Sequence, residues 1–196
     1  LIVHGSDAAL ATIVAKLMRI DALWVQVAFI PLFPDTSPVA RNWGLLPDAN
    51  PEQHLQFALE SAVRPTTLIR DDHGQVVLGA AEITGPNGAS GEMIGEAIVD
   101  SSVLYNYDPQ RAQMSAFTHG LRMMPTMGAP GLVAVPLPAP ENKKGGWWTR
   151  WRRKENIQPP VLEGRALQTG GVDLQVTRDG LAHPRALKSV TFYRHL

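Results

Sequence analysis

The stretch that decides the fold is VHGSDAALATIVAKLMRIDALWVQVAFIPLFPDTSPVAR, residues 3–41. It reads as an apolar strand end, a tight turn with glycine, a helix, a second apolar strand and a second polar loop. In an open α/β sheet, ligands bind beyond the carboxyl ends of the strands, where backbone N–H groups at a helix N-terminus can hold a phosphate. Both loops follow such strand ends. The sequence therefore predicts one cleft between them for a nucleotide or another phosphorylated ligand.

Capping residues and apolar spacing predict the helices of this stretch and of the segment after it. Ser6 or Asp7 can cap a helix over residues 8–20, because both side chains accept hydrogen bonds from backbone N–H groups. The apolar positions on one face of that helix are Leu10, Ile13, Val14, Leu17 and Met18. A second helix starts in Asp48-Ala49-Asn50-Pro51-Glu52, where proline suits the first helical position. Its expected apolar face consists of Leu55, Phe57, Ala58 and Leu59.

Strand-like patterns account for most of the remaining chain. The run Trp24 to Ile30 is apolar and rich in β-branched residues, which predicts a buried parallel strand. After Pro65 the periodicity changes to that of short strands separated by turns. The expected strands are residues 66–70, 75–83, 96–105, 112–123, 132–137, 161–168, 172–178 and 189–193, the first two joined in a hairpin by residues 71–74. Val172, Leu174 and Val176 alternate with polar residues, which predicts one wet face for their strand.

These patterns predict an α/β plus all-β chain with two lobes. An incomplete doubly wound α/β lobe, which binds the nucleotide, is expected over residues 1–63. An antiparallel β-sandwich lobe is expected over residues 64–196. Within the second lobe, residues 137–160 are expected to form a long inserted loop, because they are rich in proline and charge.

The composition of the chain bounds its partners and its location. Among 196 residues, 18 are basic and 18 acidic, so no overall field attracts nucleic acid or an anionic membrane. The absence of cysteine excludes disulfides and thiolate metal sites. No run approaches the roughly 18 apolar residues of a membrane span, and no signal peptide precedes the first strand. The expected location is cytoplasmic.

Three short motifs, in their order along the chain, carry a resemblance to a known family. Gly5-Ser6-Asp7-Ala8-Ala9 lies where that family has GGDGT, and the loop from Pro31 to Arg41 lies where it has PLGTGNDFAR. Val176-Thr177-Arg178-Asp179-Gly180 resembles its strand ending in DGE. The family is the diacylglycerol kinase catalytic domain of bacterial lipid kinases, which are relatives of sphingosine kinases and NAD kinases. The resemblance spans most of the chain and implies the two-lobed fold of these kinases.

The resemblance also implies an activity and a set of site residues. The activity is ATP-dependent phosphorylation of a lipid hydroxyl, such as that of diacylglycerol, with ATP and Mg²⁺ as cofactors. The implied catalytic residues are Asp7 and Asp179. The implied nucleotide-binding residues are Gly5, Ser6, Ala8, Asp35, Thr36, Ser37 and Arg41. No residue of the chain is assigned as a metal ligand.

Several residues depart from the family motifs. Ser6, Ala8 and Ala9 replace two glycines and a threonine at the phosphates, and Leu181 replaces the glutamate of DGE. The family has two βα units before its first loop, so part of the nucleotide-binding lobe is expected to precede Leu1. These departures leave a second interpretation open, a non-catalytic member that binds a nucleotide or a phospholipid. A NAD kinase-like enzyme is disfavoured because no dinucleotide-binding motif of that family is present.

Each candidate residue also has a purely structural interpretation. Asp7 can act as a helix N-cap, and Thr36 and Ser37 can start the helix that follows them. Arg41 can pair with an acidic neighbour instead of a phosphate. Asp179-Gly180 is a strong hairpin-turn signal. The six histidines show no metal-ligand spacing on any one element, so they are expected to be structural or surface residues.

A basic and tryptophan-rich run, KKGGWWTRWRRK at residues 143–154, indicates contact with a membrane surface. It carries six positive charges, no acid and three of the five tryptophans. Because tryptophan and basic residues anchor proteins at bilayer interfaces, the expected contacts are Trp147, Trp148, Trp151, Arg150, Arg152 and Arg153. A solvated insertion is the alternative. The expected partners are thus a nucleotide, a lipid substrate and a membrane surface, with a homodimer left open and no nucleic acid.

Overall fold

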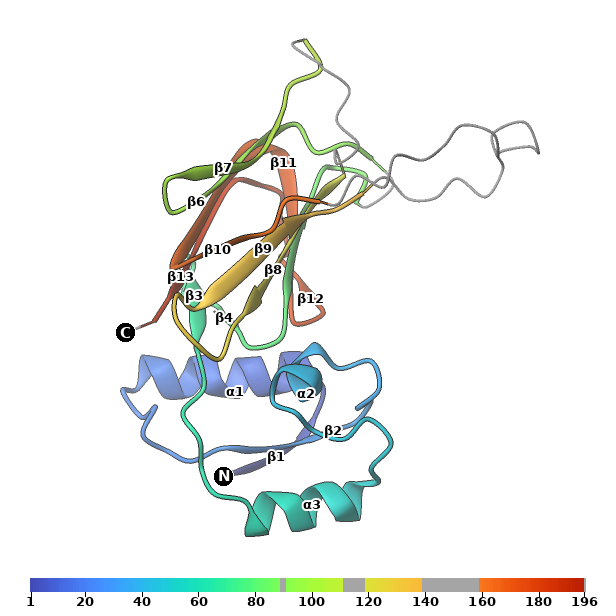
Figure 1. Cartoon of the computed structure of the whole chain (residues 1–196), viewed down its shortest axis with the longest axis vertical. Helices are drawn as coiled ribbons and strands as arrows, with labels where there is room; N and C mark the ends of the chain where they lie inside the picture. Colours follow the sequence, from blue (N-terminus) through green and yellow to red (C-terminus); the bar gives the residue numbers. More distant parts are fainter. Residues whose placement is uncertain (89–90, 111–118, 139–158, 196) are drawn as a thin grey trace, which may run out of the picture.

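The chain up to Glu60 forms a layer of two parallel strands and three helices (Figure 1). The computed structural model describes residues 1–88, 91–110, 119–138 and 159–195. β1 (Ile2–Gly5) pairs in parallel with β2 (Ala28–Pro31), and α1 (Asp7–Arg19) connects them. Two further helices, α2 (Pro38–Asn42) and α3 (Pro51–Glu60), come after β2. This arrangement places the loop after β1 and the loop after β2 at the same edge of the strand pair.

Polar caps fix where the three helices begin. Ser6 is the N-cap of α1, and Asp7 is the first residue of that helix. Ser37 is the N-cap of α2. At the start of α3, Asn50 and Gln53 form a reciprocal capping box. These starts confirm that the predicted polar signals begin helices at all three places.

Every named strand after α3 pairs antiparallel with its neighbours in the sheet. These strands are β3 (Ile69–Asp71), β4 (Val76–Val77), β5 (Ala81–Thr84), β6 (Gly95–Val99), β7 (Ser102–Tyr107), β8 (Gly120–Pro125), β9 (Leu132–Pro136), β10 (Leu162–Gly164), β11 (Ala166–Arg178), β12 (Leu181–Ala182) and β13 (Leu187–Arg194). The strand order is β10-β9-β8-β5-β11-β13-β3-β4. In addition, β6 pairs with β11 and β7, and β12 pairs with β11.

The long strand β11 holds the β part together because its two halves have different partners. Its first half pairs with β6 and β13, and the residues after Leu174 pair with β5 and β12. The change occurs at Gly170 and Gly171, just before the register with β13 shifts. A Cβ atom on Gly171 would lie 2.4 Å from the carbonyl oxygen of Ile94, so this close approach of two backbones requires glycine.

Two apolar cores stabilise the chain. The larger one lies among the β strands and contains Leu167, Leu174, Val176, Val190 and Phe192 among its fully buried side chains. The smaller one combines residues of the α/β layer with two from the β part: Val3, Leu10, Val14, Ala15, Phe29, Val39, Val76 and Leu78. Figure 1 shows α1 between the β1–β2 pair and the β strands, where it contacts β4. The second core therefore ties the helical layer to the first strands of the β part.

The prediction of a strand from Trp24 to Ile30 is wrong in extent. Only β2 is a strand, and Trp24 is 82% exposed. The cause lies just before this run, where Asp21 adopts a positive φ of 55° and the backbone N–H of Val25 donates to the carbonyl of Ala22 in a turn. An apolar run does not by itself reveal a preceding turn of this kind.

The predicted apolar face of α3 is also wrong. Leu55, Phe57 and Leu59 are exposed, and the buried residue of the helix is His54. A ring nitrogen of His54 lies 3.1 Å from the carbonyl oxygen of Leu46, so the histidine side faces the preceding loop. The helix itself is confirmed, but a polar residue occupies its buried face.

In the β part, the predicted strands are correct in place and inexact in extent. The hairpin around residues 71–74 is confirmed by the pairing of β3 with β4, whereas β5 is a separate strand. Residues 96–105 form two strands, β6 and β7, because Asp100 turns the chain with a φ of 53°. Residues 161–168 are likewise divided between β10 and β11. Of the expected strand at 112–123, only the end is described, as part of β8.

The alternation predicted for residues 172–178 is confirmed in part. Leu174 and Val176 are buried, whereas Val172 is 53% exposed. The shift of register between Gly170 and Leu174 explains the difference, because it moves Val172 out of the regular pleat.

Three expectations are bounded by what the structure describes. No helix within the described residues is long and apolar enough to cross a membrane. Most of the expected insertion at 137–160 lies outside the described residues. The helices end with α3 and the antiparallel strands begin with β3. The division into two lobes at residues 1–63 and 64–196 stays a prediction.

The difference in burial between Leu174 and Val172 allows a test of the larger core. We expect Leu174→Ala to lower the free energy of unfolding by about 2–5 kcal/mol, because it leaves a cavity among fully buried side chains. Val172→Ala, on the same strand but exposed, is the control and should change stability by roughly 0.5 kcal/mol or less. Urea unfolding followed by circular dichroism measures both values. Equal losses in the two variants would contradict the described core.

Candidate functional site

A cleft of about 350 Å³ opens where the two predicted loops meet the β part. The loop after β1 and the loop after β2 form one wall, and β5, β8 and the end of β11 form the other. The lining residues are Gly5, Ser6, Asp7, Phe33, Thr36, Ser37, Pro38, Ala80, Glu82, Arg122, Thr177, Asp179 and Gly180. Segments far apart in the sequence thus share one site.

Asp7 connects the two loops of the first wall. Its Oδ1 accepts a hydrogen bond from the Ser37 hydroxyl at 2.5 Å, and its Oδ2 accepts one from the backbone N–H of Val39 at 3.0 Å. The Ser37 Oγ in turn accepts from the N–H of Ala40. Asp7 is only 9% exposed, and it both holds the start of α2 and lines the cleft.

Asp179 occupies the facing wall, in the turn between β11 and β12. Its Oδ2 accepts from the backbone N–H of Leu78 at 2.9 Å, and its Oδ1 accepts from those of Gly79 and Ala80 at 2.8 and 2.9 Å. Burial raises the pKa of this carboxyl to about 6, with a small further contribution from the charge of Asp7, although the three N–H donors act in the opposite direction. Asp179 therefore titrates close to neutral pH.

Glu82 and Arg122 add an ion pair to the same wall. They lie opposite each other on the paired strands β5 and β8, and the Arg122 Nε donates to the Glu82 Oε1 at 2.9 Å. Arg122 is the only cation among the described residues that line the cleft. Neither residue was a predicted site residue. The sequence offers only a weak signal for these two residues, because each is simply a single charge between apolar neighbours in a predicted strand.

The structure brings together six of the nine residues for which a catalytic or nucleotide-binding role is predicted. These six are Gly5, Ser6, Asp7, Thr36, Ser37 and Asp179. Ala8 lines a different cavity, and Asp35 and Arg41 are exposed and do not line the cleft. The predicted membrane contacts at Trp147, Trp148, Trp151, Arg150, Arg152 and Arg153 lie outside the described residues.

The structure also tests the interpretation of Ser37, Asp179-Gly180 and Asp7 as capping or turn residues. Ser37 caps α2, which confirms the predicted helix start. Asp179-Gly180 forms the turn of the β11–β12 hairpin, which confirms the predicted turn. Asp7 does not cap α1, because Ser6 does; it accepts instead from the start of α2. Structural and cleft roles thus coincide at Ser37, a helix cap, and at Asp179, a turn residue, since both side chains fix the backbone and line the site.

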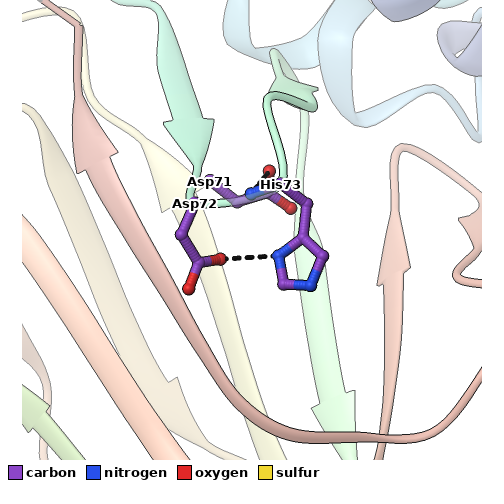
Figure 2. A group of neighbouring side chains, drawn as sticks. All are labelled: Asp71, Asp72 and His73. Carbon is purple, nitrogen blue, oxygen red and sulfur yellow. Dashed lines mark hydrogen bonds and ion pairs between the residues drawn. The ribbon is translucent and has the colours of Figure 1, made fainter.

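Among the described residues, no three acids that line the cleft lie close enough together to hold a Mg²⁺ ion by themselves. The carboxylates of Asp7 and Asp179 accept the hydrogen bonds described above, and Glu82 is paired with Arg122. Within the described ranges, three or more side chains that could hold an ion come together only at Asp71, Asp72 and His73, in the β3–β4 turn (Figure 2). There, too, Asp71 accepts two backbone N–H groups and pairs with Arg178.

The raised pKa of Asp179 predicts a specific pH dependence of stability. The unfolded chain releases this proton near pH 3.8 and the folded chain near pH 6, so stability falls as the pH rises between these values. Relative to Asp179→Asn, which does not titrate, wild-type stability should fall by up to about 3 kcal/mol from about pH 4 to about pH 7. Chemical unfolding at several pH values measures the difference. A constant difference would show that the carboxyl keeps its ordinary pKa.

Comparisons with known proteins give the fold. No family model and no curated protein sequence matches the chain. A putative diacylglycerol kinase from Bacillus anthracis str. Sterne matches with a TM-score of 0.68 and 11% identity, over 99% of this chain and 74% of that one. A diacylglycerol kinase from the same organism gives 0.63, 12%, 98% and 74%, and an NAD kinase from Archaeoglobus fulgidus in complex with ATP gives 0.54, 15%, 99% and 73%. The chain has the fold of diacylglycerol kinases and NAD kinases, as its motif order predicts.

Proposed function

We propose that the cleft is the phosphoryl-transfer site of a lipid kinase-like protein that uses ATP to phosphorylate a lipid hydroxyl such as that of diacylglycerol. The observation that carries the proposal is the meeting of Asp7 and Asp179 in one cleft with Arg122, in a chain with a kinase fold. One solved neighbour is described as a complex with ATP, which supports a nucleotide as the phosphoryl donor.

The residues of the cleft suit the two demands of phosphoryl transfer, which are positioning and charge stabilisation. Arg122 supplies a guanidinium for phosphate oxygens, held in place by Glu82. The hydroxyls of Ser6 and Thr36 line the same space and can donate to phosphate. Asp7 is the proposed acceptor of the proton from the attacking hydroxyl, and Asp179, whose pKa lies near 6 and which is largely ionised at neutral pH, assists it from the facing wall.

A second candidate function is binding without turnover, of a nucleotide or a phospholipid. The observation that favours it is the state of the two acids, which are 9% and 5% exposed and accept five hydrogen bonds between them. Carboxylates that accept these hydrogen bonds fix the backbone that surrounds the cleft. Leu181, which is 57% exposed, offers no carboxylate in their place.

A single series of variants separates the two functions. Asp7→Asn can keep both contacts to the start of α2 while it removes the charge, and we expect it to lower lipid phosphorylation by about 10²- to 10⁴-fold. Arg122→Gln should weaken binding of ATP by about tenfold, because a charge-assisted contact is lost. Arg64→Gln, which removes an exposed charge away from the cleft, is the matched control and should change neither value.

The measurements are transfer of labelled phosphate from ATP to a panel of lipids and equilibrium binding of ATP. Turnover that survives Asp7→Asn would place the chemistry elsewhere. Binding of ATP that depends on Arg122, without turnover in the wild type, would favour the second function. Absence of both ATP binding and turnover would remove the kinase proposal and the nucleotide-binding form of the second function.

Peripheral membrane contact is a separate proposal that rests on the sequence of residues 143–154. We expect replacement of Trp147, Trp148 and Trp151 by alanine to reduce co-sedimentation with vesicles that contain anionic lipid, because interfacial anchoring by indole rings is lost. Trp24→Ala is the control, since Trp24 is 82% exposed but lies outside this run. Binding that is insensitive to both the replacement and high salt would contradict the proposal.

A further inference from the structure

Phe33 presents a large aromatic side chain at the cleft, on the loop after β2. The residue is 66% exposed, and it is the one aromatic residue among the described residues that line the cleft. It belongs to neither of the two apolar cores described above. Because its ring is left in water instead of being buried, the ring contributes little to the stability of the fold. Its side chain is thus available to a ligand in the cleft.

Hydrogen bonds fix the backbone that carries this ring. The carbonyl oxygen of Phe33 accepts from the N–H group of Thr36 at 3.3 Å and from that of Ser37 at 3.0 Å. One residue earlier, the N–H group of Leu32 donates to the carbonyl oxygen of Gly5 at 2.9 Å, which joins this loop to the end of β1. A ring on a fixed backbone loses only side-chain freedom when a ligand binds, so the entropic cost of binding is low.

The remaining lining of the cleft indicates which kind of apolar group the ring receives. Apart from Phe33, apolar side chains come only from Pro38 and Ala80 among the described lining residues. Leu32 is exposed beside Phe33 but does not line the cleft. A hydrocarbon chain is bound by apolar contact on several sides, and these residues are too few and too small to supply it. A flat ring with a polar edge needs only one apolar face, which Phe33 offers.

The same space holds groups that suit phosphate. Arg122 and the hydroxyls of Ser6 and Thr36 line the cleft together with Phe33. A ligand that contacts all of these groups combines a flat ring with an anionic part, as a nucleotide does. Every nucleobase has a π face, so an aromatic side chain can stack on any of them.

We propose that Phe33 is the stacking platform for the nucleobase of a nucleotide whose phosphates face Arg122 and the hydroxyls of Ser6 and Thr36. This inference rests on the proposed function of the cleft and adds to it the residue that binds the base. The motif that this loop resembles, PLGTGNDFAR, is rich in glycine where this chain has Phe33. The platform is therefore a feature of this chain's own sequence.

The test is equilibrium binding of ATP to the full chain by calorimetry, together with saturation-transfer NMR spectra of the bound nucleotide. Phe33→Ala should weaken ATP binding by at least about fivefold, because one contact between base and aromatic ring is lost. Phe33→Leu keeps an apolar side chain without a π face and should also weaken binding, whereas Phe33→Tyr should bind ATP as the wild type does. In the wild type the adenine protons should receive more saturation than the ribose protons, and this difference should disappear in Phe33→Ala.

Two further variants serve as controls. Phe57→Ala is the matched control, because Phe57 is 52% exposed on α3 and does not line the cleft; ATP binding should stay unchanged. Arg122→Gln should weaken ATP binding through the phosphates, while the adenine protons of the bound nucleotide keep their larger share of saturation. Thermal melting of each variant checks that it folds, and replacement of an exposed side chain should change Tm little.

Two results would overturn this inference and leave the proposed function standing. One is ATP binding that stays unchanged in Phe33→Ala; if that variant also binds a short-chain diacylglycerol more weakly, the ring contacts the lipid instead. The other is wild-type affinity in Phe33→Leu with equal saturation of adenine and ribose protons, which would mean that the ring supplies only an apolar contact. Failure of ATP to bind the wild type would overturn the nucleotide site itself, and this inference with it.

Discussion

The three hydrogen bonds that Asp179 accepts from Leu78, Gly79 and Ala80 are the constraint on which the rest of the site depends. They tie the end of β11 to the segment before β5, about a hundred residues earlier in the chain. That segment lies directly against α2, since a Cβ atom on Gly79 would be 2.8 Å from the backbone nitrogen of Val39. Asp7 accepts a hydrogen bond from this same nitrogen. Two carboxylates thus fix both walls of the cleft relative to each other.

This arrangement creates a conflict between stability and reactivity. A carboxylate that accepts backbone N–H groups is stabilised in its ionised form, whereas burial favours the protonated form. For Asp179 burial prevails, and the resulting pKa near 6 is suited to proton transfer although the group is almost inaccessible. The two proposed functions correspond to the two sides of this conflict. In one the acids take part in the reaction, and in the other they only hold the cleft in shape.

Local signals predicted the fold where local chemistry decides it. Ser37 and Asn50 begin helices because their side chains accept from nearby N–H groups, and Asp179-Gly180 turns because both residues accept a positive φ. Prediction failed where distant segments decide the outcome. The face that α3 buries depends on the loop at Leu46, and the Glu82–Arg122 pair depends on the register of β5 against β8. Neither relation leaves a period or a motif in the sequence.

The end of β11 shows how one strand can shape two separate spaces. Successive side chains of a strand point to opposite faces, so Thr177 lines the cleft while Arg178 lines a second cavity, of about 390 Å³, between α1, the β3–β4 turn and the β11–β12 hairpin. The first turns of α1 divide in the same way, with Ser6 and Asp7 on one side and Ala8 on the other. Arg178 pairs with Asp71, and Asp179 accepts from the N–H group of Leu78. Residues of one segment, 71–80, thus help to position both spaces. Asp71 pairs with Arg178 beside the second cavity, whereas Asp179 accepts from N–H groups in the wall of the cleft. A variant at Asp71 therefore removes the anchor of the cavity, and a variant at Asp179 removes the anchor of the cleft.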